Sequence, residues 1–224
     1  MGYTHYWLLR EEEMERVMET LPLIVADFKK FLPHLPPLAG PQGKGKPEFG
    51  EDRVGFNGPE PDDYESFFFP DSRPEGFPYS EDSSWRFAFC KTGRRPYDLA
   101  VQVFLLLAKL HLGKAMRLRS DGSLVEWVPA AELVERVLGA SLDLPSLLDR
   151  TFLLFRDGKG RPFLYEVTLG SVGEKVGERR DLLREVEEYL PHPFKPGVVL
   201  EGVGIEVPLR EIQERHIRGD FYSF

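Results

Sequence analysis

Residues 97–112 are apolar on almost every side of the helix that their spacing predicts. Pro96 suits the first position of such a helix, and Gly113 suits the residue just past its end. Because the apolar side chains run nearly all the way round the helix axis, we expect this helix to be buried on most of its sides. The rest of the chain must therefore supply packing partners around one central helix.

Several segments rich in aromatic and aliphatic residues predict strands that pack on this helix. Tyr3–Leu9 alternates aromatic and aliphatic side chains, and Trp85–Cys90 combines Trp and Phe with residues that favour strands. Arg53–Asn57 and Glu65–Phe69 are shorter strand candidates around an acidic turn. We therefore expect an α+β fold, in which an antiparallel or mixed sheet packs on the buried central helix.

The remaining segments of the first 139 residues predict helices and one hairpin. Apolar residues at helical spacing over residues 10–32 predict a helix that Pro22 should kink or split. Met116–Arg119 and Leu124–Trp127 flank a Ser-Asp-Gly turn, which is typical of a β-hairpin. The amphipathic residues Pro129–Leu138 predict a further helix.

A smaller unit is predicted after residue 140. Its expected elements are a hairpin over 151–169 with a turn at 157–160, a helix over 178–190 and a strand over 198–208. We therefore divide the chain into a first domain, residues 1–139, and a C-terminal α/β extension, residues 140–224. Leucines just after residue 140 lead us to expect that the extension packs on the first domain.

The overall composition argues against several classes of protein. The 224 residues carry 37 acidic and 29 basic side chains, and the formal charge of -8 disfavours a general nucleic-acid coating protein. A hydrophobic content of 42% disfavours a disordered chain, and a single cysteine excludes an internal disulfide framework or a cysteine-rich zinc site. The most apolar stretch, Leu99–Leu112, is too short for a membrane span and no signal peptide is evident, so we expect a cytoplasmic protein. Usage rich in Arg, Pro and Leu is typical of a thermophile.

The charge is distributed unevenly along the chain. Residues 1–90 carry a net charge of -8 and residues 120–224 a net charge of -6, whereas residues 91–119 carry +6. A basic segment in an acidic protein focuses the electric field and attracts anions to one place.

The front of this basic segment, Cys90–Asp98, connects a predicted strand to the N-terminus of the central helix. Free backbone N–H groups and the positive end of the helix dipole favour an anion there. Cationic side chains beside that end repel it, and either a bound phosphate or carboxylates of the protein itself would relieve the repulsion. The predicted ligand-binding residues are Lys91, Thr92, Arg94, Arg95 and Tyr97.

Four short segments stand in a distinctive order along residues 1–139: Gly2–Trp7, Phe56–Gly58 with Glu65–Phe67, Phe89–Asp98, and Ser120–Gly122. In this order and spacing they resemble a family of uncharacterised bacterial and phage proteins. Gly93 stands where that family usually has Ala, and Tyr64 stands where His often precedes the Glu. The resemblance implies no activity, because the family has none established, but it covers the same basic loop. Residues 140–224 lie outside it.

Catalysis at this loop would require an acid or base, for which His5 and Glu65 are the candidates. The five histidines lack the spacing typical of a metal site. The alternative is a metal site assembled from residues far apart in the sequence, such as His5, Glu65 and Asp121. Cys90 beside Lys91 is either a buried strand residue, which we favour, or a thiolate nucleophile.

Two further patterns have both a structural and a functional interpretation. Residues 40–47 match the first part of a phosphate-binding P-loop, but Pro47 stands where Ser or Thr should hold magnesium, so we interpret them as a loop. Aromatic residues of the predicted strands are typical of a core at this spacing, and their alternative role is the stacking of nucleic-acid bases. They are Tyr3, Tyr6, Trp7, Phe67, Phe68, Phe69, Trp85, Phe87 and Phe89.

These observations lead to two hypotheses about function. In the first, the loop binds a phosphate-bearing ligand, either a nucleotide or a nucleic acid. In the second, the chain is a non-catalytic interaction module whose basic loop meets an acidic protein, with a homodimer as one form. The motifs indicate no particular cofactor, and they leave open whether the protein is an enzyme.

Overall fold

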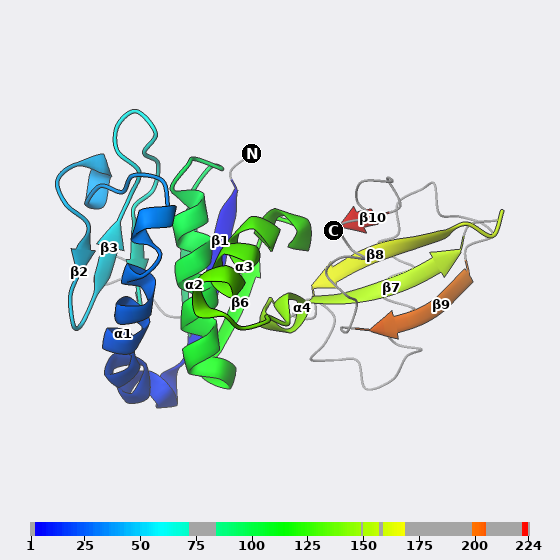
Figure 1. Cartoon of the computed structure of the whole chain (residues 1–224). Coiled ribbons are helices and arrows are strands. Elements are labelled where there is room, and N and C mark those ends of the chain that lie inside the picture. Colours follow the sequence, from blue (N-terminus) through cyan, green and yellow to red (C-terminus); the bar gives the residue numbers. More distant parts are fainter. Residues whose placement is uncertain are drawn as a thin grey trace. The chain divides into compact units, whose positions relative to one another are not determined.

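A computed structural model of the chain describes residues 3–71, 84–148, 150–156, 159–168, 199–204 and 221–223 (Figure 1). The chain divides into two compact units. The first consists of Met1–Gly122 and Trp127–Leu142, and the second of Ser123–Glu126 and Asp143–Phe224. Helices and largely antiparallel sheets make up the described residues, which is the α+β fold that the sequence predicts.

The first unit is built on a three-stranded sheet with β1 (Thr4–Arg10) in its centre. β5 (Trp85–Lys91) and β6 (Met116–Ser120) each pair with β1 in antiparallel register. β5 and β6 therefore run parallel to each other, and a parallel pair needs a crossover connection. The helix α2 (Asp98–Leu112) provides this crossover and packs on the sheet.

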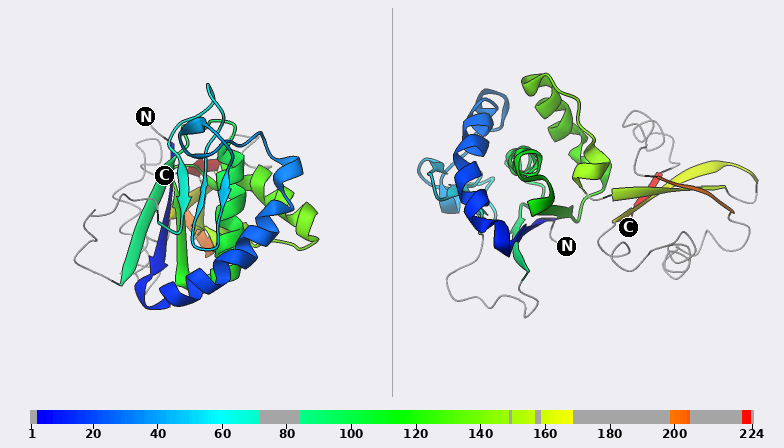
Figure 2. Two further views of the ribbon diagram at one scale, coloured as in Figure 1. Left: turned by 90° about the vertical axis from the view of Figure 1, so that its left-hand side faces the viewer. Right: turned by 90° about the horizontal axis from the view of Figure 1, so that it is seen from below.

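α2 is the central helix that the sequence predicts, and its burial on most sides is confirmed. Ten of its 15 residues are buried, and it ends at Gly113, whose φ of 57° suits glycine. Figure 2 shows α1 (Met14–Lys29), α2 and the part of α3 (Leu124–Leu138) after Trp127 on the same face of the sheet. The apolar sides of α2 are thus covered by the sheet on one side and by other elements around it.

A second, smaller sheet packs against α2 through aromatic side chains. It consists of β2 (Glu48–Phe49), β3 (Val54–Phe56) and β4 (Phe67–Phe69), paired in antiparallel order. The ring of Phe104 in α2 lies 5.3 Å, centre to centre, from the rings of Phe67 and Phe69. These two aromatic residues are fully buried, so they belong to the core and do not stack ligands.

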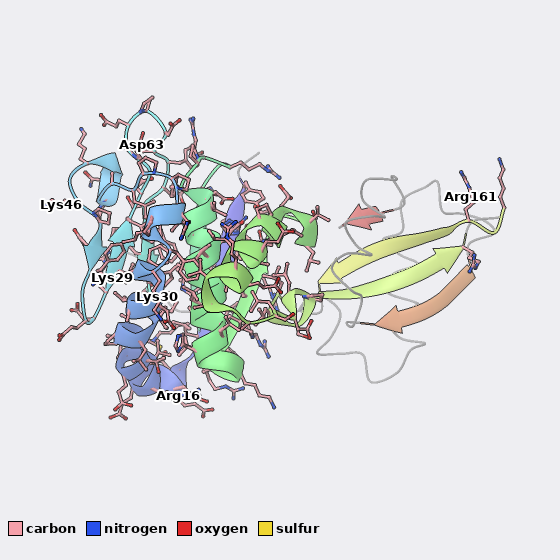
Figure 3. All side chains as sticks on the ribbon, in the orientation of Figure 1. Arg16, Lys29, Lys30, Lys46, Asp63 and Arg161 are labelled. Atoms are coloured by element: carbon pink, nitrogen blue, oxygen red, sulfur yellow. The ribbon has the colours of Figure 1, made fainter. Side chains whose placement is uncertain are left out.

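A polar contact joins the ends of α1 and α2. Asp27 accepts a hydrogen bond from Lys30 at 2.7 Å, and its second oxygen lies 2.8 Å from Nε2 of His111. The hydrogen bond from Lys30 is the main reason that the pKa of Asp27 lies below its ordinary value of 3.8. Figure 3 labels Lys30 at the end of α1.

The hairpin predicted around the Ser-Asp-Gly turn is wrong. β6 forms one of its strands, but Leu124–Trp127 begins α3, which continues through Pro129. The Ser123 N–H donates to Oε2 of Glu126 at 3.0 Å, which is one half of a capping box at a helix start. Pro22 is predicted to kink or split the first helix, and it does not split it, because α1 continues through Pro22.

The described strands of the second unit form a four-stranded sheet in the order β10-β8-β7-β9. β7 (Arg150–Arg156) and β8 (Pro162–Thr168) are antiparallel, which confirms the predicted hairpin. β9 (Val199–Gly204) pairs with β7 within the predicted 198–208 strand, and β10 (Phe221–Ser223) runs parallel to β8. The helix predicted over 178–190 lies outside the described residues.

Short helical segments complete the described structure. They are the 3-10 helices Glu11–Glu13, Leu32–His34, Pro41–Gly43 and Gly113–Ala115, and the short α4 (Leu144–Leu147). Within the part of the chain that the structure describes, none of the helices combines the length and apolar character needed to cross a membrane.

Candidate ligand-binding site

The basic turn, residues Lys91–Asp98, leads from the last residue of β5 to the first residue of α2. The N–H groups of Thr92 and Gly93 both donate to the carbonyl of Tyr3, at 3.0 and 3.3 Å. Within the turn, Arg95 N–H donates to the Thr92 carbonyl at 3.0 Å. The turn is therefore held by backbone hydrogen bonds both to itself and to the residue that precedes β1.

A cluster of polar side chains lies beneath the basic turn, centred on Asp98. Oδ1 of Asp98 lies 2.7 Å from Nε2 of His5 and accepts a short hydrogen bond from the hydroxyl of Thr92. Its Oδ2 atom accepts from Gln102 Nε2 at 3.1 Å. Because Asp98 is the first residue of α2, its carboxylate also meets the positive end of the helix dipole. The Asp98 carboxylate thus occupies the helix N-terminus, where the sequence predicts that an anionic ligand binds.

His5 links this cluster to β6. Its side chain is 0% exposed, its Nδ1 atom lies 3.0 Å from Oγ of Ser120, and its ring meets Tyr3 and Trp127 edge to face. With the proton on Nε2, His5 donates to Asp98 and accepts the hydroxyl proton of Ser120, which satisfies both ring nitrogens. We call His5, Thr92, Asp98, Gln102 and Ser120 the Asp98 network. The predicted acid/base residue His5 therefore has both ring nitrogens bonded within the protein.

Glu65, the second predicted acid/base residue, lies on another side of the turn. Its Oε2 atom accepts from the Lys91 N–H at 3.0 Å, and its carbonyl accepts the Tyr97 hydroxyl at 2.7 Å. Tyr97 is fully buried, and this burial raises the pKa of its hydroxyl. Glu65 and Tyr97 thus tie the turn to the segment before β4, and Glu65 has different partners from His5.

Three predicted ligand-binding residues, Lys91, Arg94 and Arg95, present exposed cationic side chains on the turn. The guanidinium of Arg94 lies 4.1 Å from the ring centre of Tyr3, over its face. Among the described residues, no carboxylate lies within ion-pair distance of the side chains of Lys91 or Arg95. The other two predicted residues, Thr92 and Tyr97, use their hydroxyl groups inside the protein.

The backbone of the turn is unusual at two adjacent residues. Gly93 and Arg94 both have a φ of 57°, in the left-handed region that residues with a side chain rarely adopt. Glycine adopts this region freely, whereas Arg94 is strained there by about 1 kcal/mol. The structure therefore holds an arginine where glycine would be easier to accommodate.

Other chemistry that the sequence leaves open has little support from the structure. Cys90 is buried, and this burial, followed by the charges of Glu65 and Asp98, raises its pKa well above the ordinary 9.0. Residues 40–47 are followed by strand β2 and not by the helix of a P-loop. Among the described residues, no group of three or more His, Cys, Asp or Glu side chains is placed to hold a metal ion.

The central role of Asp98 is absent from the sequence-based predictions, and so are the roles of Gln102 and Ser120. A signal for the first two is present, because Asp98 and Gln102 are four residues apart in a segment that is otherwise almost entirely apolar. Two polar residues on one side of a buried helix must find partners within the protein.

Comparisons of the chain with protein-family models, with curated proteins and with solved structures find no match. The site therefore has to be interpreted from its own geometry.

Proposed function

We propose that the basic turn binds a phosphate-bearing ligand, a nucleotide or a nucleic acid, through Lys91, Arg94 and Arg95. Arg and Lys side chains are suited to phosphate because they supply charge and several N–H donors. The three side chains lie within five residues of one turn and are all exposed. The proposal also fits the distribution of charge, since this turn opens the basic segment of an otherwise acidic chain.

The observation that carries the proposal is the left-handed backbone of Arg94. Strained residues persist where the surroundings impose them, and they occur often at ligand-binding sites. The Asp98 network and the buried Tyr97 hold the turn in this shape from beneath. The strain at Arg94 places a guanidinium at the surface over the face of Tyr3. We infer that binding of an anion is the purpose of this arrangement.

The Asp98 carboxylate has a positioning role in this proposal. It accepts hydrogen bonds from Thr92 and Gln102 and contacts His5. Its negative charge therefore balances the positive end of the α2 dipole within the protein. The ligand then meets the outer surface of the turn, formed by Lys91 and Arg95, and not the helix end itself.

The proposal is tested by thermal-shift measurements with ATP as the probe. A ligand that binds only the folded protein raises its apparent melting temperature by mass action, so ATP should stabilise the wild-type chain. The double variant Arg94→Gln with Arg95→Gln keeps the length of both side chains but removes their charge, and ATP should no longer protect it.

Lys46→Gln is the matched control for this experiment. Lys46 is an exposed cation in the segment that resembles the start of a P-loop, and Figure 3 labels it. ATP should protect this variant as it protects the wild type. Equal protection of the Arg94/Arg95 double variant, or loss of protection in Lys46→Gln alone, contradicts the proposal.

A further inference from the structure

We infer that the ligand of the basic turn is a single-stranded nucleic acid, whose bases stack on the uncovered face of the β5-β1-β6 sheet. This inference rests on the proposed function and adds a second surface to it. We call this surface the open face. Its residues are Tyr6, Leu8, Arg10, Trp85, Phe87, Phe89, Arg117 and Arg119.

Alternation along the strands separates the open face from the core. In β1, His5, Trp7 and Leu9 are buried, whereas the residues between them are partly exposed. Successive side chains of a strand point to opposite faces, so these intervening residues lie on the face away from α2. Figure 2 shows the helices of the first unit on the α2 side, and no described helix covers the other face.

The strand register collects aromatic and cationic side chains on this face. Tyr6 of β1 stands opposite Phe89 of β5 on one side and Arg119 of β6 on the other. Two residues further along β1 on the same face, Leu8 lies between Phe87 of β5 and Arg117 of β6. The face therefore has an aromatic edge along β5 and a cationic edge along β6.

The rings on the open face are arranged as a platform. The rings of Tyr6 and Phe87 are stacked, with centres 5.9 Å apart and planes inclined by 25°, and the Phe89 ring is 6.0 Å from Phe87. Phe87 is 40% exposed, which leaves much of its side chain accessible. Exposed rings on a sheet are the surface on which single-stranded nucleic acids stack their bases.

Guanidinium groups lie among these rings. The Cζ atoms of Arg10 and Arg117 lie 4.9 and 4.3 Å from the ring centre of Trp85. Among the described residues of this face, Arg10 pairs with Glu12, and the Tyr6 hydroxyl donates to Asp121. Arg117 and Arg119 add two positive charges along β6, which suit the phosphate groups between stacked bases.

The open face is continuous with the basic turn. Lys91 is two residues after Phe89 and four after Phe87, so the three side chains leave β5 on the same face. A strand of nucleic acid that lies along β5 thus passes from aromatic rings to the cations of the turn. Bases in a duplex are paired and stacked within the helix, so a ring platform selects a single strand.

Other occupants fit this surface less well. A symmetric dimer would bring the arginines of both copies into one interface, where their like charges repel. An acidic peptide would match the arginines, but it would leave the stacked rings of Tyr6 and Phe87 without an aromatic partner. A single-stranded nucleic acid supplies both flat rings and regularly repeated negative charges.

The test is fluorescence anisotropy with a labelled single-stranded oligothymidylate of about 12 nucleotides, compared with a duplex of the same length. We expect the single strand to bind more tightly, and its affinity to fall with salt as phosphate contacts release counterions. Phe87→Leu keeps an apolar side chain but removes the ring, and it should weaken binding about tenfold. Leu110→Ala is the matched control, since Leu110 is also 40% exposed but lies on α2.

A second readout uses the tryptophans. The chain has three, and Trp7 and Trp127 are fully buried, whereas Trp85 lies on the open face. Binding of the oligonucleotide should therefore quench fluorescence in the wild type but not in Trp85→Phe. Quenching that persists in Trp85→Phe contradicts the inference.

The failures of the two proposals are distinguishable. If ATP protection depends on Arg94 and Arg95 but the oligonucleotide does not bind, or binds Phe87→Leu as tightly as wild type, the open face is not its platform and the phosphate site stands. If the Arg94/Arg95 double variant keeps both the ATP protection and the oligonucleotide affinity of the wild type, the proposed phosphate site is wrong. Tighter binding of the duplex, equal competition by poly-glutamate, or a dimer that Phe87→Leu dissociates each overturns the single-strand inference.

Discussion

Nε2 of His5 lies 2.7 Å from Oδ1 of Asp98, and this contact joins the second residue of β1 to the first residue of α2. Neither residue is one of the exposed cations of the basic turn, yet both determine the position of the turn, because Thr92 donates to the same oxygen of Asp98. The ligand-facing cations and the buried network are therefore parts of one arrangement.

Loss of the Asp98 carboxylate should destabilise the protein strongly. Asp98→Asn keeps the shape of the side chain but replaces an oxygen that accepts hydrogen bonds with an amide that donates, so at least one buried donor loses its partner. We expect urea unfolding to show a loss of about 2–4 kcal/mol. Asp121→Asn is the control, because Asp121 is exposed and, among the described residues, accepts its side-chain hydrogen bond from the Tyr6 hydroxyl, so its loss should be under about 1 kcal/mol. Equal losses in the two variants contradict the central role of Asp98.

The hydroxyl of Thr92 can be tested separately from its methyl group. Thr92→Val keeps the shape of the side chain but removes the donor to Asp98, and should lower the free energy of unfolding by about 1.5–3 kcal/mol. Thr92→Ser retains the hydroxyl and should recover most of that loss. If Thr92→Ser is as unstable as Thr92→Val, packing of the methyl group and not the hydrogen bond holds the turn.

Some of this arrangement could be predicted from the sequence. The central helix follows from its apolar residues and its flanking Pro96 and Gly113, and the basic turn follows from local charge. The burial of Thr92 and Tyr97 does not, because it depends on partners contributed by Tyr3, just before β1, and by the segment before β4, far away in the sequence. Local sequence patterns depend on residues that are close together along the chain, so they cannot predict these long-range contacts.

The error at α3 has a different cause. Leu124–Trp127 is a short apolar run, and such a run fits a buried strand as well as a helix. The residues Ser123 and Glu126 have the spacing of a capping box and could have decided for the helix. The sequence predicts a helix that begins at Pro129, whereas Pro129 lies in the interior of α3.

A methyl group at Gly122 should disturb the packing of Tyr3. A Cβ atom there would lie 2.3 Å from the Tyr3 hydroxyl oxygen and 2.7 Å from its ring, closer than these atoms can approach. We expect Gly122→Ala to lower the free energy of unfolding by about 1–3 kcal/mol, measured by urea denaturation. Adding Tyr3→Phe removes the nearest atom but not the ring, so it should recover only part of the loss. Full recovery would show that the ring itself is not constrained.

Cys90 should be inert in the folded protein. Burial raises its pKa, so at pH 8 the thiol is protonated and inaccessible, and iodoacetamide should label it only after unfolding. Because the folded pKa exceeds the ordinary value of 9.0, the unfolded state loses this proton first. The contribution to stability is complete below pH 9 and is lost as the pH rises further. Rapid labelling of the native protein at pH 8, followed by mass spectrometry, is the result that contradicts this prediction.

Arg94→Gly separates stability from binding at the basic turn. Glycine adopts a φ of 57° freely, so the substitution removes about 1 kcal/mol of strain, while the contact of the guanidinium with the Tyr3 ring is lost. These effects have opposite signs and similar size, so the melting temperature without ligand should change little. ATP protection and oligonucleotide affinity should both fall, because the charge is gone.

Arg94→Gln is the comparison, since it loses the same charge but keeps the strain, and it should be the less stable of the two. An Arg94→Gly variant that is markedly less stable than Arg94→Gln would show that Arg94 is not strained, which contradicts the proposed function.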